Sequence, residues 1–198
     1  MKRRAYREWE YWGRPVPGFG DPRASLLIVG LAPAAHGANR TGRMFTGDRS
    51  GDFLYRLLHR EKFATQGVSR RRDDGLRLRK TYISAVCRCA PPDNKPLPEE
   101  MANCRGYLAE EMRILRPRAV LALGKTAFEG FLTMLRMQGR LPARPASKFA
   151  HGAEFELPGA LPRLFCSYHP SQQNTQTGRL NEKMLLRVLR RIRRFLEE

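Results

Sequence analysis

The chain has 198 residues, 41% of them hydrophobic, so one domain spanning residues 1–198 is the default expectation. Its 37 Lys and Arg residues against 19 Asp and Glu give a formal net charge of +18, which favours a polyanionic partner such as nucleic acid. No apolar run approaches the ~18 residues of a membrane-spanning helix, and no apolar signal segment is recognisable. We therefore expect a cytoplasmic, nucleoid-associated protein without a membrane partner.

Strand and helix patterns alternate from the first apolar run onward. Residues 25–30 (SLLIVG) are continuously apolar, as expected for a strand that is covered on both faces. Residues 51–63 carry Phe and Leu at helical spacing. After a charged loop, the β-branched and aromatic residues of 81–89 (TYISAVCRC) predict a second strand. Residues 97–115 predict a helix whose first turn is acidic, as the helix dipole favours.

The same alternation continues to the end of the chain. Residues 118–124 (RAVLALG) predict a third buried strand, and residues 125–137 predict the helix behind it. A loop rich in Pro and Arg leads to the last strand at 163–169, and residues 181–198 form an amphipathic helix with outward arginines. This order predicts an α/β fold with a mainly parallel sheet.

Three polar loops follow three of the predicted strands. They are GLAPAAHGANRTGRMFTGD at 30–48, APPDNKPLP at 90–98 and HPSQQNTQTGRL at 169–180. In open α/β sheets, ligands bind outside the carboxyl ends of the strands. The three loops therefore predict a ligand site at that edge of the sheet.

Each candidate residue in these loops also has an ordinary structural reading. Asp48 could cap the helix that follows it, and Phe45 could be a core aromatic. Asn94 and His36 could be turn residues, and His169 could be bonded to backbone. Their convergence on neighbouring loops of a cationic protein favours a shared function.

That function is the binding and cleavage of a nucleobase. An aromatic ring can stack a flipped base, and an amide can pair with its edge. A histidine can stabilise the departing anion, and a carboxylate can orient water or stabilise a cationic sugar. The sequence contains no GxxxxGK[ST], HExxH or GxSxG motif that would point to another chemistry.

The three loops also resemble the signature regions of the uracil-DNA glycosylase superfamily, specifically its family 5 or UDGb branch. The similarity runs from about Trp12 to the C-terminal helix, with the motifs in the family's order. The resemblance implies a three-layer α/β/α sandwich around a short, mainly parallel sheet. It also implies base excision repair by a monofunctional glycosidase, which hydrolyses the bond to a flipped uracil and leaves an abasic site. The open alternatives are a non-catalytic DNA-binding or damage-sensing protein with this fold, and a generic basic domain that binds DNA or RNA.

The resemblance carries roles over to single residues. Phe45 matches the aromatic that stacks the base, and Asn94 matches the amide that reads its edge. His169 matches the histidine near the base O2, and Asp48 matches the carboxylate that assists water attack. Leu31 stands where stricter relatives place a polar catalytic side chain, which in this branch goes with tolerance for hypoxanthine and xanthine.

Further residues of the same loops complete the predicted DNA site. We expect base contacts from the first loop and a polar segment that enters the minor groove, which could otherwise be a solvated loop. We expect a monomer that binds duplex DNA with deaminated bases, with single-stranded DNA left open. The base contacts are Leu31, Ala32, His36 and Asn39; the minor-groove residues are Gln172, Gln173 and Asn174; the phosphate contacts are Arg40, Arg43 and Arg179.

The cysteines raise the question of a metal site. In a reducing compartment the four cysteines are core thiols or metal ligands. The resemblance implies a [4Fe-4S] cluster, for which Cys89 and Cys104 match two of four ligands, whereas the upstream CxxC pair has no counterpart. A start site further upstream, loss of the cluster, or another metal at Cys87 or Cys166 would each account for this. The last alternative is disfavoured because Cys87 and Cys89 alternate across the predicted strand.

Overall fold

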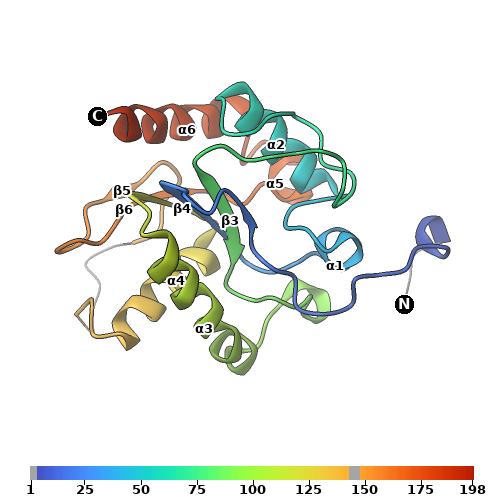
Figure 1. The fold of residues 1–198 in the computed structure, drawn as a ribbon, viewed down its shortest axis with the longest axis horizontal. Helices are drawn as coiled ribbons and strands as arrows, with labels where there is room; N and C mark the ends of the chain where they lie inside the picture. Colours follow the sequence, from blue (N-terminus) through green and yellow to red (C-terminus); the bar gives the residue numbers. More distant parts are fainter. Residues whose placement is uncertain (1–3, 143–147) are drawn as a thin grey trace.

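The computed structural model describes residues 4–142 and 148–198. Its centre is a six-stranded sheet in the order β1-β3-β2-β4-β6-β5 (Figure 1). The four central strands are parallel, and the two short edge strands are antiparallel to their neighbours. The strands are β1 (Phe19–Gly20), β2 (Leu26–Gly30), β3 (Thr81–Ala85), β4 (Ala119–Leu123), β5 (Glu154–Phe155) and β6 (Arg163–Ser167).

Helices cover both faces of the sheet, which gives three layers. Helices α2 (Arg49–Arg60) and α6 (Glu182–Glu197) pack together on one face, and α3 (Pro98–Leu115) and α4 (Lys125–Met137) pack on the other (Figure 1). The prediction of an α/β/α sandwich is therefore confirmed.

Alternating side chains of the central strands pack into two separate cores, one on each face of the sheet. In β2, Leu26 and Ile28 join the core under α2 and α6, whereas Leu27 and Val29 join the core under α3 and α4. All five residues of β2 are buried. Because successive strand side chains point to opposite faces, a strand that is covered twice must be apolar throughout. The apolar run at 25–30 follows from this requirement.

Most predicted elements lie within a few residues of their predicted bounds, but β3 ends earlier than predicted. It ends at Ala85 instead of residue 89, and its partner β2 ends at Gly30. The last ladder bonds run from Val86 N to Gly30 O and from Cys87 N to Leu31 O. Cys89 thus lies beyond the strand, so the argument that Cys87 and Cys89 alternate across it does not hold.

Several short elements were not predicted. They comprise the edge strands β1 and β5, the one-turn helices α1 (Ala38–Thr41) and α5 (Gln172–Gln176), and the 3₁₀ helices Arg4–Tyr6 and Pro92–Asn94. Elements of two to five residues are too short to show a hydrophobic period. No helix within the described ranges is both long and apolar enough to cross a bilayer.

Candidate active site

The loops after β2, β3 and β6 meet at the carboxyl edge of the sheet, as predicted. They enclose an outer hollow of about 450 Å³ and a narrower inner slot, which share Ala34, Asp48 and Ser50. The outer hollow is also lined by Tyr6, Ala35, His36, Gly37, Gly47, Arg49, Asn94 and Gln172. The inner slot is also lined by Ala32, Pro33, Ala38, Met44, Phe45, Ala85 and His169.

Phe45 and His169 face each other in the inner slot. Their ring centroids are 5.8 Å apart, with the planes tilted by 32°. Phe45 adopts a left-handed backbone conformation with φ of 52°, which costs free energy in a non-glycine residue. Two glycines make room for it, because a Cβ at Gly30 would lie 3.0 Å from the ring and a Cβ at Gly51 would collide with Phe45 O. The surrounding chain therefore holds the ring in place.

Asp48 caps a helix and also lines both hollows, so the structural and the functional interpretation of this residue hold together. Its Oδ1 accepts a hydrogen bond from Gly51 N at 2.9 Å and caps α2. Its Oδ2 faces Gly37, where any Cβ would collide with it. Burial raises the pKa of Asp48 above its usual range, although the Gly51 and Ser50 N–H groups act in the opposite direction. A buried carboxylate of raised pKa is a stronger base than an exposed one.

His169 is held from behind and is uncharged at neutral pH. Burial lowers its pKa to about 4, so the imidazole is neutral near pH 7. Asn174 Nδ2 donates to His169 O at 2.8 Å, which fixes the backbone on the far side. Asn174 is thus half-buried and bonded to the chain behind His169, whereas a freely exposed amide was expected at this position of the third loop.

Asn94 lies at the mouth of the site. It is exposed, ends the 3₁₀ helix Pro92–Asn94 and lines the outer hollow together with Gln172. Asp93 and Asn94 have φ values of 51° and 57°, so the turn is sharply bent. An amide at this place can meet a base as it enters the inner slot.

The residues of the first loop that were predicted to contact the base lie in different places. Ala32 lines the inner slot, and His36 lines the outer hollow, where its Nδ1 lies 3.0 Å from Tyr11 Oη. Leu31 is half-buried, and its carbonyl accepts from Cys87 N. Asn39 Nδ2 bonds to the Ala35 carbonyl at 3.5 Å, and Asn39 lines neither hollow.

Arg40 is 5% exposed and acts as an internal tie. Its guanidinium lies 4.1 Å from the ring centroids of both Tyr6 and Trp9. It donates to the carbonyls of His36 at 2.8 Å and Gly47 at 3.0 Å, so it joins the middle of the first loop to its end. With its donors used in this way and its surface covered, Arg40 does not match the expected phosphate contact.

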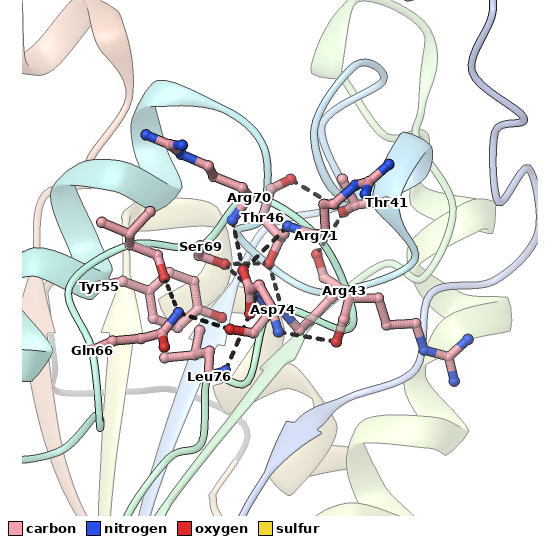
Figure 2. A network of polar contacts seen from close by, with 12 residues as sticks. Thr41, Arg43, Thr46, Tyr55, Gln66, Ser69, Arg70, Arg71, Asp74 and Leu76 are labelled. Atoms are coloured by element: carbon pink, nitrogen blue, oxygen red, sulfur yellow. Dashed lines mark hydrogen bonds and ion pairs between the residues drawn. The ribbon is translucent and has the colours of Figure 1, made fainter.

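Arg43 is 2% exposed and lies at the centre of a buried polar network (Figure 2). Its Nη2 donates to both carboxylate oxygens of Asp74, at 2.8 and 2.7 Å, and to Ser69 Oγ at 2.9 Å. Its Nε donates to Thr46 Oγ1 at 2.9 Å. This also differs from the expected phosphate contact, because the guanidinium is enclosed by the protein.

Asp74 and Ser69 belong to the loop at 61–80, which returns to the first loop. Ser69 O accepts from Gly47 N at 3.0 Å, one residue before Asp48. Burial alone would raise the pKa of Asp74. Hydrogen bonds from Arg43 and from backbone N–H groups outweigh burial and hold the pKa of Asp74 below its usual range. No local pattern in the sequence predicts this support, since Arg43 and Asp74 are separated by 31 positions.

The remaining residues of the third loop stay on the surface. Gln172 and Gln173 are exposed at the start of α5, which Ser171 caps through a bond from Asn174 N. Arg179 is exposed, and its guanidinium lies 4.7 Å from the ring centroid of Tyr168. These three exposed side chains stay available to an external ligand.

The cysteines do not complete a four-thiolate site within the described residues. Cys104 Sγ accepts from Arg88 N at 3.3 Å, and Cys89 is exposed. Burial, together with the neighbouring Cys104, raises the pKa of Cys87 to about 12, and Cys166 is buried in β6. Across the ranges 4–142 and 148–198, no three His, Cys, Asp or Glu side chains are grouped so that they could hold a metal ion. The donor set therefore does not fit a [4Fe-4S] cluster.

Comparison with known proteins gives one consistent result. Residues 17–193 match the family described as the uracil DNA glycosylase superfamily. The chain is 49% identical over 195 residues to a type-5 uracil-DNA glycosylase of Thermus thermophilus, covering 98% of this chain and 86% of the relative. It is 50% identical to a protein of that name from Mycobacterium bovis (98% and 72% covered), and 46% identical to one from Pyrobaculum aerophilum (95% and 79% covered).

Proposed function

The chain belongs to the uracil DNA glycosylase superfamily, and we propose that it is a DNA-repair enzyme that excises uracil by hydrolysing its N-glycosidic bond. The observation that carries this proposal is the inner slot. There Phe45, Asp48 and His169, from two separate loops, surround a single narrow space. A protein that only bound DNA would not require a carboxylate and an imidazole, both half-buried, in the same slot.

A flipped uracil would lie flat in this slot. Its ring would stack on Phe45, whose orientation is fixed by the close approach of Gly30 and Gly51. The walls formed by Ala32 and Ala85 are apolar and exclude water from the base faces. Asn94 and Gln172 would meet the polar edge of the base at the mouth.

Asp48 would activate the attacking water. The water oxygen forms a bond to C1′ while the bond from C1′ to the base nitrogen breaks, and the water proton passes to the Asp48 carboxylate. The raised pKa of Asp48 makes it a better proton acceptor, and its charge also stabilises the cationic character of the sugar. Since Oδ1 accepts from Gly51 N, we assign the acceptance of the water proton to Oδ2.

His169 would stabilise the leaving group. The electron pair of the broken bond leaves with the base, and negative charge collects on O2 before the base takes up a proton. A neutral imidazole retains one N–H donor for this oxygen. Because the pKa of His169 is about 4, the donor is the neutral ring at physiological pH.

The proposal extends to the substrate range. Ala32 lines the inner slot without a polar group, and its chain neighbour Leu31 is also apolar, which supports acceptance of hypoxanthine and xanthine as well as uracil. Gln172 lines the outer hollow, and Gln172, Gln173 and Arg179 are exposed and would contact the DNA around the flipped base. We propose a monomeric, single-domain enzyme that acts on nucleoid DNA in the cytoplasm, and no step depends on a metal cluster.

We propose that the reaction stops at the abasic site. The described residues that line the two hollows include no lysine that could form a Schiff base with the sugar. Strand breaks should therefore appear only after alkaline treatment.

The test compares the wild type with Asp48→Asn. Asparagine keeps the oxygen that caps α2 but cannot accept the water proton, so the variant should fold normally. We expect single-turnover excision from a uracil-containing duplex to fall by about 10²- to 10⁴-fold, with DNA binding retained. Equal rates for the two proteins would remove Asp48 from the mechanism. Tight binding without excision by the wild type would favour a damage-sensing protein.

A further inference from the structure

We propose that Arg70, Arg71 and Arg72 form a second DNA-backbone contact, called here the arginine turn, beside the active-site mouth. The inference rests on the proposed function for the identity of the partner, which is the sugar-phosphate backbone of the substrate DNA. All three side chains are exposed. None lies in the three loops that form the inner slot.

The backbone of the arginine turn is fixed before any ligand binds. The Asp74 carboxylate accepts hydrogen bonds from Arg70 N at 2.8 Å, Arg71 N at 3.2 Å and Leu76 N at 3.2 Å. Arg72 O accepts from Arg43 Nη1 at 3.2 Å. Figure 2 shows the side chains of Arg70 and Arg71 leading away from the carboxylate that holds their backbone. The buried network thus fixes the turn and leaves its charges outside.

Two tryptophan rings lie next to the guanidinium groups of this surface. The Arg71 guanidinium lies 5.4 Å from the Trp9 ring centroid, and that of Arg72 lies 4.6 Å from the Trp12 centroid. The Arg14 guanidinium lies 3.9 Å from the centroid of the same Trp12 ring. Stacking on an aromatic face orders a guanidinium while its edge stays free to donate hydrogen bonds. A planar donor of this kind matches a phosphate.

The charge of this surface is positive even with its carboxylates included. A hollow of about 530 Å³ is lined by the exposed Arg71 and Arg72 and by the carboxylates Glu10 and Asp73. Arg70 directly precedes Arg71 in the chain, and Arg14 lines the adjoining hollow. The exposed arginines thus outnumber these carboxylates, which suits a polyanion.

The arginine turn lies next to the catalytic loop. Arg40 lines the hollow of the arginine turn and is covered by Tyr6 and Trp9; Tyr6 lines the outer hollow of the active site. Ser69, directly before Arg70, is bonded to Gly47, directly before Asp48. A DNA strand with its flipped base at Asp48 would therefore pass the arginine turn. Contacts there would position the duplex without reading its sequence.

The test replaces all three arginines with glutamine, which keeps a long side chain and removes the charge. A matched control replaces the exposed residues Arg113, Arg116 and Arg194 with glutamine, which removes the same number of positive charges. The control residues lie toward the amino ends of the parallel strands, where Arg118, directly before β4, donates to Leu196 O at the end of α6. Melting temperatures of both triple variants establish that they are folded.

Binding to an undamaged duplex is measured over a range of salt concentrations. For the arginine-turn variant we expect the slope of log K against log salt to shrink by about 0.9 for each lost phosphate contact. The control variant should keep nearly the wild-type slope. Equal slopes for the two triple variants would overturn the proposal.

Excision provides the second readout. The arginine-turn variant should raise KM for a uracil-containing duplex while kcat, and the rate on a trinucleotide too short to reach the turn, remain at the wild-type level. An equal loss on the duplex and the trinucleotide would contradict a backbone-contact role. If the wild type excises nothing while the salt slope falls as expected, the proposed function fails and the DNA contact stands.

Discussion

Replacing Asp74 with alanine should destabilise the protein strongly, because it leaves a buried guanidinium without its counter-ion. Arg43 is 2% exposed and Asp74 is 16% exposed, and the pair is joined by two short hydrogen bonds. Without Asp74, Arg43 Nη2 keeps only its bond to Ser69 Oγ. Removing one partner of a buried ion pair costs about 3–5 kcal/mol, and the partial exposure of Asp74 favours the lower end.

Thermal unfolding measures this loss. For a chain of this size, about 3 kcal/mol corresponds to a fall in melting temperature of about 6–12 °C. The matched control is Glu110→Ala, which breaks the exposed pair between Glu110 and Arg113 and should leave the melting temperature unchanged. A second readout is excision, which should fall about 10- to 100-fold at a temperature where the variant is folded, because Ser69 and Arg43 support the segment before Asp48.

The pH dependence gives the effect a sign that can be checked. Because the folded-state pKa of Asp74 is lowered, its ionised form stabilises the fold above the unfolded carboxyl pKa of about 3.9. This contribution is lost as the pH falls through the folded-state pKa. The difference in melting temperature between the wild type and Asp74→Ala should therefore shrink in acid. A variant that melts with the wild type at pH 7, or a difference that stays constant into strong acid, would refute the reasoning.

Three further predictions concern the catalytic loops. Gly51→Ala should cut excision by more than tenfold, because its Cβ collides with Phe45 O and displaces the stacking ring; normal activity in a kinetic assay would contradict this. Arg40→Gln should lower stability by about 2–3 kcal/mol in denaturant unfolding, since the carbonyls of His36 and Gly47 lose buried donors; Arg49→Gln is the exposed control. The contribution of His169 to the free energy of unfolding of the wild type should fall by about 3 kcal/mol as the pH falls from 6.5 to 4, because His169 takes up a proton in the unfolded state but not in the folded state. In unfolding titrations, His169→Gln should make the free energy of unfolding less dependent on pH over this range.

The elements that the sequence predicted well are those with a repeating pattern. Helix α4 occupies the predicted residues 125–137, because its apolar side chains recur at the period of a helix whose one face is buried. The meeting of three loops at the carboxyl edge was also predictable, since parallel strands end together. Asp48 was given two competing readings from the sequence, and one carboxylate satisfies both because it has two oxygens.

The support of the site could not be predicted in the same way. Arginines in a chain of net charge +18 are expected on the surface, yet Arg40 and Arg43 are buried because carbonyls, rings and Asp74 enclose them. The loop at 61–80 has no period that would indicate its return to Gly47. Asn174 is polar and follows a loop signature, but its amide bonds to the chain behind His169. Such contacts join distant positions, and a single sequence carries no local signal for them.

The central claim is that the slot around Phe45, Asp48 and His169 hydrolyses the bond between uracil and deoxyribose. The most direct test incubates the purified wild-type chain with a duplex that carries one uracil and measures free uracil together with alkali-labile sites. The account predicts equal amounts of both products, with strand breaks appearing only after alkali. Binding of the duplex with no release of uracil would contradict it.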